Sequence, residues 1–175
     1  VGETGKGKTT LIRLVLSLLH PQKGCIEIYN KTTRLSLTNL SRNNFSYVPQ
    51  GNTLLNGTIK SNLILGNEYA TETDMVNALT AACANFVFNS EKGLDMPCGE
   101  GGNGLSEGQA QRISIARALL KPCSILIMDE ATSSLDEDTE KNVIKNITNL
   151  YPEKTIIFIT HRPEILKYCT HVLHL

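Results

Sequence analysis

The sequence predicts an α/β fold with a mostly parallel sheet, and three observations support that prediction. Two continuous apolar runs, 125–128 and 156–159, have the length of strands and are typical of parallel strands covered on both faces. Helical patterns lie before and between these runs, so helix and strand alternate along the chain. The chain has 175 residues, of which 41% are hydrophobic and 19% charged, and this suits one domain that buries a substantial core.

The first part of the chain is predicted to form one apolar helix and two short strands. Nearly every position of 9–20 is apolar, which indicates a helix that is buried on most sides. Segments 25–29 and 45–48 have the composition and length of strands, and Pro49 closes the second. We therefore expect the sheet to include a strand that ends just before Gln50.

Three further helices follow in the sequence. The first begins with Asp74, an acid that the helix dipole favours there, and keeps apolar residues at helical spacing: Met75, Val76, Leu79, Ala82, Cys83 and Phe86. Four glycines then mark a loop: Gly99, Gly101, Gly102 and Gly104. The second helix covers 106–120, where Ser106 and Gln109 have the spacing of a capping box. The third follows the acidic turn 136–138 and has one apolar face: Val143, Ile144, Ile147 and Leu150.

Composition and charge exclude several classes of protein. Basic and acidic residues both number 17, so the formal net charge is zero and a general basic field for nucleic acid is not expected. The five cysteines form no CxxC pair, which disfavours a disulfide framework or a zinc site and favours a reducing compartment. The longest apolar stretch, 11–19, is interrupted by Arg13 and is too short to cross a bilayer.

A glycine-rich segment at the start of the chain has the pattern of a phosphate-binding loop. It fits GxxxxGK[ST], whose backbone N–H groups surround phosphate oxygens at the start of a helix. Lys8 would neutralise the β- and γ-phosphates, and the Thr9 hydroxyl would bind Mg²⁺. The residues expected to contact the nucleotide are Gly2, Glu3, Thr4, Gly5, Lys6, Gly7, Lys8, Thr9 and Thr10. The alternative is a glycine-rich helix cap without a ligand.

Polar side chains follow three predicted strands at the point where each ends. Asp129 and Glu130 come directly after one apolar run, His161 follows the next run, and Gln50 follows the strand 45–48. Ligands gather at the carboxyl ends of strands in open α/β sheets. We expect Asp129 to position Mg²⁺ and Glu130 to act as general base toward water. His161 is expected to contact the γ-phosphate or the water, and Gln50 the metal or the water. The alternative for the two carboxylates is a strand that simply reaches solvent.

Together these residues resemble one family, the nucleotide-binding domains of ABC transporters. The most specific motif is Leu-Ser-Glu-Gly-Gln at 105–109, which is similar to the LSGGQ signature of that family. The other motifs stand in family order: 2–9 resembles the Walker A loop, Gln50 the Q-loop, 125–129 the Walker B strand, 133–136 the D-loop and His161 the switch histidine. The resemblance covers essentially the whole chain and implies an ATPase with a P-loop NTPase (RecA-like) core and an inserted α-helical subdomain.

The resemblance also implies a role for each site residue. Glu130, His161 and Gln50 would be catalytic, and Thr9, Gln50 and Asp129 would hold Mg²⁺. In the family two domains pack head to tail, so that the signature of one domain completes the ATP site built on Lys8 of the other. Residues implied to contact ATP in this way are Ser106, Gly108, Gln109 and Asp136.

A finer resemblance is to exporters, and it implies the domain organisation and the partners. It rests on Tyr-Val-Pro-Gln at 47–50 and on Gly-Glu-Gly at 99–101, which resembles the exporter X-loop. The core would comprise 1–51 and 120–175, and a helical subdomain about 52–119, ending in the signature helix. That subdomain and the Glu100 loop would contact a transmembrane domain, upstream in the same chain or in a separate subunit, at the cytoplasmic face of the membrane. No nucleic acid partner is expected.

Two departures from the family pattern leave alternatives open. Glu107 replaces the first signature glycine, which slightly favours a regulatory half-site that closes on ATP without cleaving it, whereas Glu130 and His161 favour hydrolysis. The chain also begins at Val1 directly before the phosphate loop, so we expect a strand and an adenine-stacking aromatic upstream. A soluble ABC ATPase of DNA repair or translation is a further alternative, although Ser106 lies only 98 positions after Lys8, which leaves no room for a long coiled coil.

Overall fold

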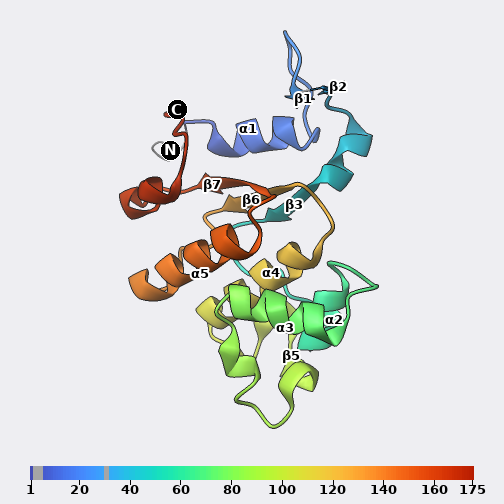
Figure 1. The fold of residues 1–175 in the computed structure, drawn as a ribbon, viewed down its shortest axis with the longest axis vertical. Helices are drawn as coiled ribbons and strands as arrows, with labels where there is room; N and C mark the ends of the chain where they lie inside the picture. The colour runs from blue at the N-terminus through green and yellow to red at the C-terminus, as the bar shows by residue number, and fades with distance from the viewer. Residues whose placement is uncertain (2–5, 30–31) are drawn as a thin grey trace.

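The computed structural model describes residues 1, 6–29 and 32–175, which contain both helices and strands (Figure 1). The strands are β1 (Glu27–Tyr29), β2 (Arg34–Ser36), β3 (Phe45–Val48), β4 (Gly57–Thr58), β5 (Pro97–Cys98), β6 (Ile125–Asp129) and β7 (Thr155–Ile159). The α-helices are α1 (Lys8–Val15), α2 (Ile59–Ile64), α3 (Glu72–Ala81), α4 (Glu107–Leu120) and α5 (Glu137–Leu150). Turns of 3₁₀ helix cover Asn39–Asn44, Asn85–Val87, Gly93–Asp95, Glu100–Gly102 and Pro163–Tyr168.

The central sheet has three parallel strands in the order β3-β6-β7, which confirms the predicted α/β fold. Val48 pairs with Met128, and Met128 pairs with Phe158, so the three strands end together. Two separate antiparallel pairs, β1 with β2 and β4 with β5, lie outside this sheet. Because neighbouring parallel strands end in register, the residues that follow them lie at one edge of the sheet.

The side chains of the sheet alternate between two faces, and helices cover both. Ile127 packs on one face with Ile12 and Leu16 from α1 and the end of that helix. Leu126 and Met128 point to the other face, into the larger cluster that α4 and α5 complete. Figure 1 shows the same layers, with α1 on one side of the sheet and α4 and α5 on the other.

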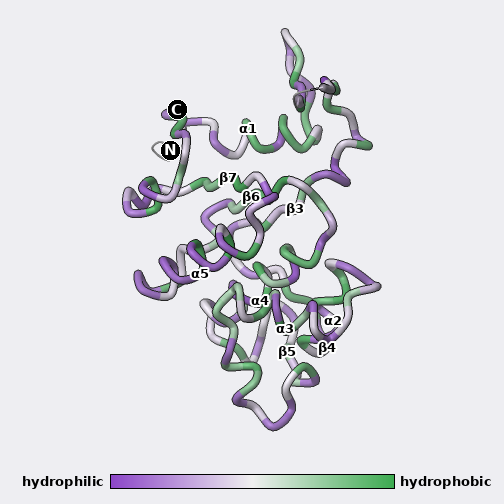
Figure 2. The backbone as a smooth tube through the Cα atoms, viewed as in Figure 1, coloured by the Kyte–Doolittle hydropathy of each residue, from purple (hydrophilic) through white to green (hydrophobic). Residues whose placement is uncertain are grey.

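The first helix is shorter and more exposed than the sequence predicts. It ends at Val15 instead of residue 20, because the chain turns at Ser17, whose φ of 52° is incompatible with a continuing helix. Only Ile12 is buried within α1, and Leu18 beyond its end is 55% exposed. The prediction of burial on most sides is therefore wrong, since the sheet covers only one side of the helix. Hydrophobic residues nevertheless lie along much of α1 (Figure 2), so several of them are at least partly exposed.

The segment between β3 and β6 is mainly helical, with α2 and α3 packed against α4. Here α3 ends at Ala81 because Cys83 adopts a φ of 55°, so Phe86 lies in a 3₁₀ turn and outside the predicted helix. The predicted helix over 106–120 and the helix after the acidic turn 136–138 are both present, as α4 and α5. None of the helices in the described part of the chain combines the length and the hydrophobicity that a membrane crossing requires.

Candidate functional site

The start of α1 and two strand ends line one cavity of about 370 Å³. Its walls are Gly7, Lys8, Thr9, Thr10, Gln50, Asp129 and Glu130. Gly7 is the N-cap of α1 with a φ of 91°, a left-handed conformation that glycine adopts without strain. The first turn of α1 contains no acidic residue, so its N-terminal dipole and the Lys8 ammonium provide a positive environment for an anion. The predicted contacts Gly2, Glu3, Thr4 and Gly5 lie outside the described residues, and Lys6 is exposed beside them.

The carboxylate of Glu130 lies between the two other predicted strand-end residues. The Gln50 amide donates a hydrogen bond from Nε2 to Glu130 Oε2 at 3.0 Å, and His161 Nδ1 lies 3.5 Å from Glu130 Oε1. Glu130 has a φ of 50°, a left-handed conformation that costs a non-glycine residue roughly 1–3 kcal/mol. Its backbone N–H donates to Ile159 O at 2.9 Å, which fixes this turn to β7. The structure therefore brings Gln50, Glu130 and His161 together, as the sequence predicts.

Asp129 has a hydrogen-bond partner whose role the sequence analysis missed. The Tyr47 hydroxyl donates to Asp129 Oδ2 at 2.9 Å. Burial raises the pKa of Tyr47 to about 12, and the hydrogen bond to Asp129 adds to this rise. Tyr47 therefore remains a donor throughout the physiological pH range. In the observed register Tyr47 pairs with Ile127, so the two-residue alternation along the strands places residues 47 and 129 on the same face of the sheet; the sequence shows the alternation but not the register.

The donor groups in the cavity suit Mg²⁺ only together with a phosphate ligand. Among residues 6–29 and 32–175, no group of three or more His, Cys, Asp or Glu side chains is arranged to hold a metal ion. The cavity instead offers the carboxylates of Asp129 and Glu130, the hydroxyls of Thr9 and Thr10, and the amide of Gln50. Mg²⁺ is commonly held by one or two carboxylates plus substrate phosphates and waters, so the residues present fit this ion.

The signature residues lie outside this cavity. Ser106 is the N-cap of α4: its Oγ accepts the Gln109 N–H at 3.2 Å, and Gln109 Oε1 accepts the Ser106 N–H at 2.9 Å. This confirms the predicted capping box. Gly108 lies against the 133–136 turn, where an added Cβ would stand 3.1 Å from the Ser134 carbonyl oxygen. Glu107, the first residue of α4, is exposed.

Asp136, the remaining predicted nucleotide contact, caps α5. Its Oδ1 accepts the Thr139 N–H at 2.9 Å, and this backbone hydrogen bond lowers the pKa of Asp136. The residues Ser106, Gly108, Gln109 and Asp136 are therefore not brought to the cavity of Lys8 within one chain.

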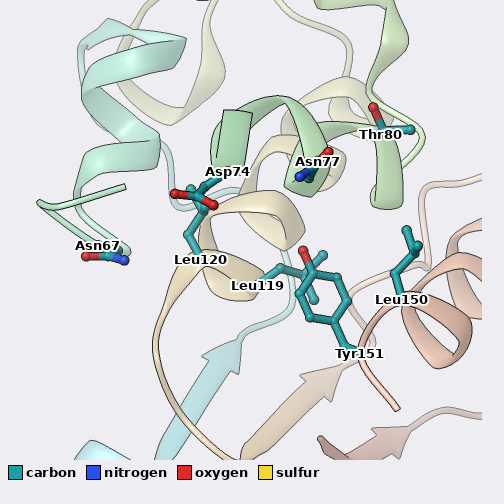
Figure 3. Close-up of a pocket in the computed structure, with 8 residues that line it drawn as sticks. All are labelled: Asn67, Asp74, Asn77, Thr80, Leu119, Leu120, Leu150 and Tyr151. Atoms are coloured by element: carbon teal, nitrogen blue, oxygen red, sulfur yellow. The ribbon is translucent and has the colours of Figure 1, made fainter. Parts of the chain in front are cut away.

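A separate cavity of about 590 Å³ lies away from the strand ends (Figure 3). It is lined by residues near α3 and at the ends of α4 and α5: Asn67, Asp74, Asn77, Thr80, Leu119, Leu120, Leu150 and Tyr151. Asp74 is occupied with capping α3, where hydrogen bonds from Thr71 lower the pKa of its carboxyl group. None of the predicted site residues lines this cavity, and we do not assign the candidate site to it.

Comparison of the sequence with known proteins identifies one family. The family model described as "ABC transporter" matches residues 1–133. The chain is 42% identical over 174 residues to the ATP-dependent lipid A-core flippase of Desulfotalea psychrophila, covering 99% of the chain and 30% of that protein. It is 44% identical over 180 residues to the Beta-(1-->2)glucan export ATP-binding/permease protein NdvA of Rhizobium etli, covering 100% of the chain and 30% of that protein.

A solved structure agrees with these relatives. The structure of a bacterial Atm1-family ABC exporter with ATP bound superimposes with a TM-score of 0.82 at 33% sequence identity, over 94% of this chain and 29% of that one. The chain thus spans about 30% of the length of the flippase and of the glucan exporter.

Proposed function

This chain belongs to the ABC transporter family, and from that premise we propose that it is the nucleotide-binding domain of an exporter, which binds and hydrolyses ATP to drive transport across a membrane. The observation that carries the proposal is the shared cavity in which Lys8, at the start of α1, meets Asp129 and Glu130, at the end of β6. The names of the two relatives, a flippase and a glucan exporter, support the direction of transport.

The cavity is suited to hold the triphosphate of ATP. The N-terminal backbone N–H groups of α1 and the Lys8 ammonium bind the β- and γ-phosphate oxygens, in agreement with the GxxxxGK[ST] sequence pattern. Thr9, Gln50 and Asp129 would hold Mg²⁺ together with phosphate oxygens. When bound, Mg²⁺ neutralises the negative charge that develops on the transferring phosphoryl group.

The residues around Glu130 support hydrolysis. A water molecule attacks the γ-phosphorus while the Glu130 carboxylate accepts its proton, and the bond to ADP breaks. Gln50 and His161, which contact the two carboxylate oxygens, orient the carboxylate and the water. Such positioning contributes because the reacting atoms must be aligned before the chemical step.

Two such domains would form a head-to-tail dimer. Ser106, Gly108, Gln109 and Asp136 do not line the Lys8 cavity of their own chain, which supports a role at the site of a partner. The domain itself would consist of a core, 1–51 and 120–175, and a helical subdomain, about 52–119. The two parts share one hydrophobic cluster, to which Met128 of β6 and Leu79 of α3 both belong, so a movement of one part would be passed to the other.

The helical subdomain and the Glu100 loop would contact a transmembrane domain at the cytoplasmic face of the membrane. Glu100 is exposed at the start of its 3₁₀ turn. The same turn is tied to the segment after Gln50, because Gly101 donates its N–H to Leu54 O at 3.1 Å and the Asn52 amide donates to Gly101 O. Contact at this loop would therefore be transmitted to the strand end that carries Gln50.

The alternatives are less well supported. Names of transport proteins among the relatives do not favour a soluble ATPase of DNA repair or translation. The regulatory half-site remains a second candidate because of Glu107, whose exposed carboxylate in the first turn of α4 would face the γ-phosphate of a partner site. Glu130, held by Gln50 and adjacent to His161, favours hydrolysis instead.

The decisive test is Glu130→Gln in the full-length protein. The amide keeps the shape of the side chain and can still accept from Gln50, but it cannot take a proton from water. We expect the rate of ATP hydrolysis to fall by roughly 10²–10⁴-fold while Mg·ATP binding is retained. The matched control is Glu153→Gln, an exposed glutamate in the turn before β7, at the opposite end of the sheet.

The outcomes separate the candidates. Wild-type protein that binds no Mg·ATP would contradict the proposed function. Wild-type protein that binds ATP without cleaving it would favour the regulatory half-site. If Glu130→Gln hydrolysed ATP as fast as Glu153→Gln, the general base would have to be another residue.

A further inference from the structure

The 133–136 turn between β6 and α5 is held on one side by the helix that carries the signature. Gln111 of α4 is fully buried, and its Oε1 accepts hydrogen bonds from the Ser134 N–H at 3.3 Å and from Ser134 Oγ at 2.5 Å. Its Nε2 donates to Ser133 Oγ at 3.4 Å. Gly108, one turn earlier, allows the Ser134 carbonyl to approach α4 closely. The turn is therefore seated on α4 by both hydrogen bonds and packing.

Arg162 holds the same turn from the other side. Its Nη2 donates to Ser133 O at 2.7 Å and its Nη1 donates to Leu135 O at 3.2 Å, so the planar guanidinium spans two carbonyl groups of the turn. The backbone N–H of Arg162 donates to Thr160 Oγ1 at 2.9 Å, which orders the segment after β7. Because Arg162 directly follows His161, the guanidinium joins the turn to the segment that carries the histidine.

A buried carboxylate completes this arrangement. Glu140 of α5 is 2% exposed, and its Oε2 accepts from Arg162 Nη1 at 2.9 Å. Among the described residues, its other oxygen has no hydrogen-bond partner. Burying a carboxylate with one unpaired oxygen is costly, so packing alone does not account for it. Glu130, Ser133, Glu140, His161 and Arg162 all line one small space.

We propose that Arg162 is a positioning residue that fixes the 133–136 turn and the His161 segment to each other. This inference rests on the proposed function, in which His161 and Glu130 serve the ATP site of their own chain while Ser106 and Asp136 serve that of the partner. When α4 moves against a partner site, Gln111 moves the turn, and Arg162 transmits that movement to His161 beside Glu130. Arg162 does not line the Lys8 cavity, and it acts through the two segments it joins.

The test removes both charged partners at once in the full-length protein. The double variant Arg162→Met with Glu140→Leu keeps similar side-chain volumes and leaves no unpaired buried charge, so the fold is retained. We expect kcat for ATP hydrolysis to fall by about tenfold to a hundredfold, while KM for ATP changes by less than about twofold, because the Lys8 cavity is untouched. The control is Arg42→Met, which also removes bonds from one arginine to two carbonyl oxygens, Leu16 O and Ser17 O, away from the turn.

A second variant separates positioning from charge neutralisation. Arg162→Lys keeps a cation beside Glu140 but lacks the planar group that spans Ser133 O and Leu135 O. We expect it to fold with a melting temperature lowered by only a few degrees, through the loss of those two hydrogen bonds, and to share the low kcat of the double variant. If the double variant fails to fold, Arg162→Lys alone decides the matter.

Each result supports or overturns the inference. A kcat for either variant equal to that of Arg42→Met would overturn it, as would full rescue by Arg162→Lys. A parallel rise in KM would also overturn it, because the effect would then lie in nucleotide binding. Failure of the proposed function would give a different result. In that case the wild-type protein itself, and not only these variants, would show no ATP hydrolysis that depends on Glu130.

Discussion

Replacing Gly108 by alanine sets two effects of known size against each other. Gly108 lies in the first turn of α4, and an alanine in a helix is about 1 kcal/mol more favourable than a glycine. The new Cβ, however, would stand 3.1 Å from Ser134 O and 3.3 Å from Leu135 Cδ2. Contacts this close require the neighbouring atoms to move by a few tenths of an ångström.

The packing effect should be the larger of the two. Overpacking a well-filled contact costs about 1–3 kcal/mol when the neighbours cannot yield. Ser134 cannot yield freely, because Gln111 holds its N–H and its hydroxyl and Arg162 holds the carbonyls on either side. We therefore expect Gly108→Ala to lower the free energy of unfolding by about 1 kcal/mol net, the cost of roughly 2 kcal/mol exceeding the helix gain.

Thermal unfolding of the purified domain, followed by circular dichroism, measures this balance. A loss of about 1 kcal/mol lowers the melting temperature by roughly 3 °C in a chain of this size. The control is Asn142→Ala, an exposed position of α5 where the helix gain acts alone and stability should rise by about 0.5 kcal/mol. If Gly108→Ala raised the melting temperature as Asn142→Ala does, the turn would be able to yield and the reasoning would be wrong.

Three other changes have expected outcomes. Ser106→Ala removes the acceptor for the Gln109 N–H and should lower the free energy of unfolding, measured in urea, by about 1 kcal/mol, with most of the loss recovered in Ser106→Thr. In the folded protein the pKa of Tyr47 is about 12, above its ordinary value of 10.0, so the stabilising contribution of its protonated hydroxyl is complete below pH 10 and is lost as the pH rises toward 12. The difference in free energy of unfolding between wild type and Tyr47→Phe should therefore narrow between pH 10 and 12. A constant difference over that range would contradict this prediction. Glu140→Ala leaves the partly buried Arg162 cation without its carboxylate and should lower the free energy of unfolding by about 2–3 kcal/mol. A loss below roughly 0.5 kcal/mol in the same urea assay would show that the ion pair contributes little.

The parallel core was predictable from the sequence because its strands are buried and therefore continuously apolar. The predicted strand 45–48 coincides with β3, and the runs 125–128 and 156–159 each lie within one residue of β6 and β7. The short α2 was not predicted, since its six residues give too little periodicity. Its N-cap Thr58, which accepts from Ser61, is the signal that was available.

The site was predictable in its residues but not in its contacts. Gln50, Asp129, Glu130 and His161 could be placed at one edge because parallel strands in register end together. The hydrogen bond from Tyr47 to Asp129 depends on register and rotamer, which a sequence does not display. The contacts of Arg162 depend on where the 133–136 turn packs, and spacing along the chain carries no information on that.

The order of the site residues along the chain has a consequence for its synthesis. Lys8, Gln50, Glu130 and His161 come from positions spread over nearly the whole sequence, and β7 supplies the carbonyl that fixes the Glu130 turn. A growing polypeptide that has emerged from the ribosome only as far as β6 therefore lacks the histidine and the support for its glutamate. Under the proposed function, such a nascent chain would hydrolyse no ATP before the last strand had joined the sheet.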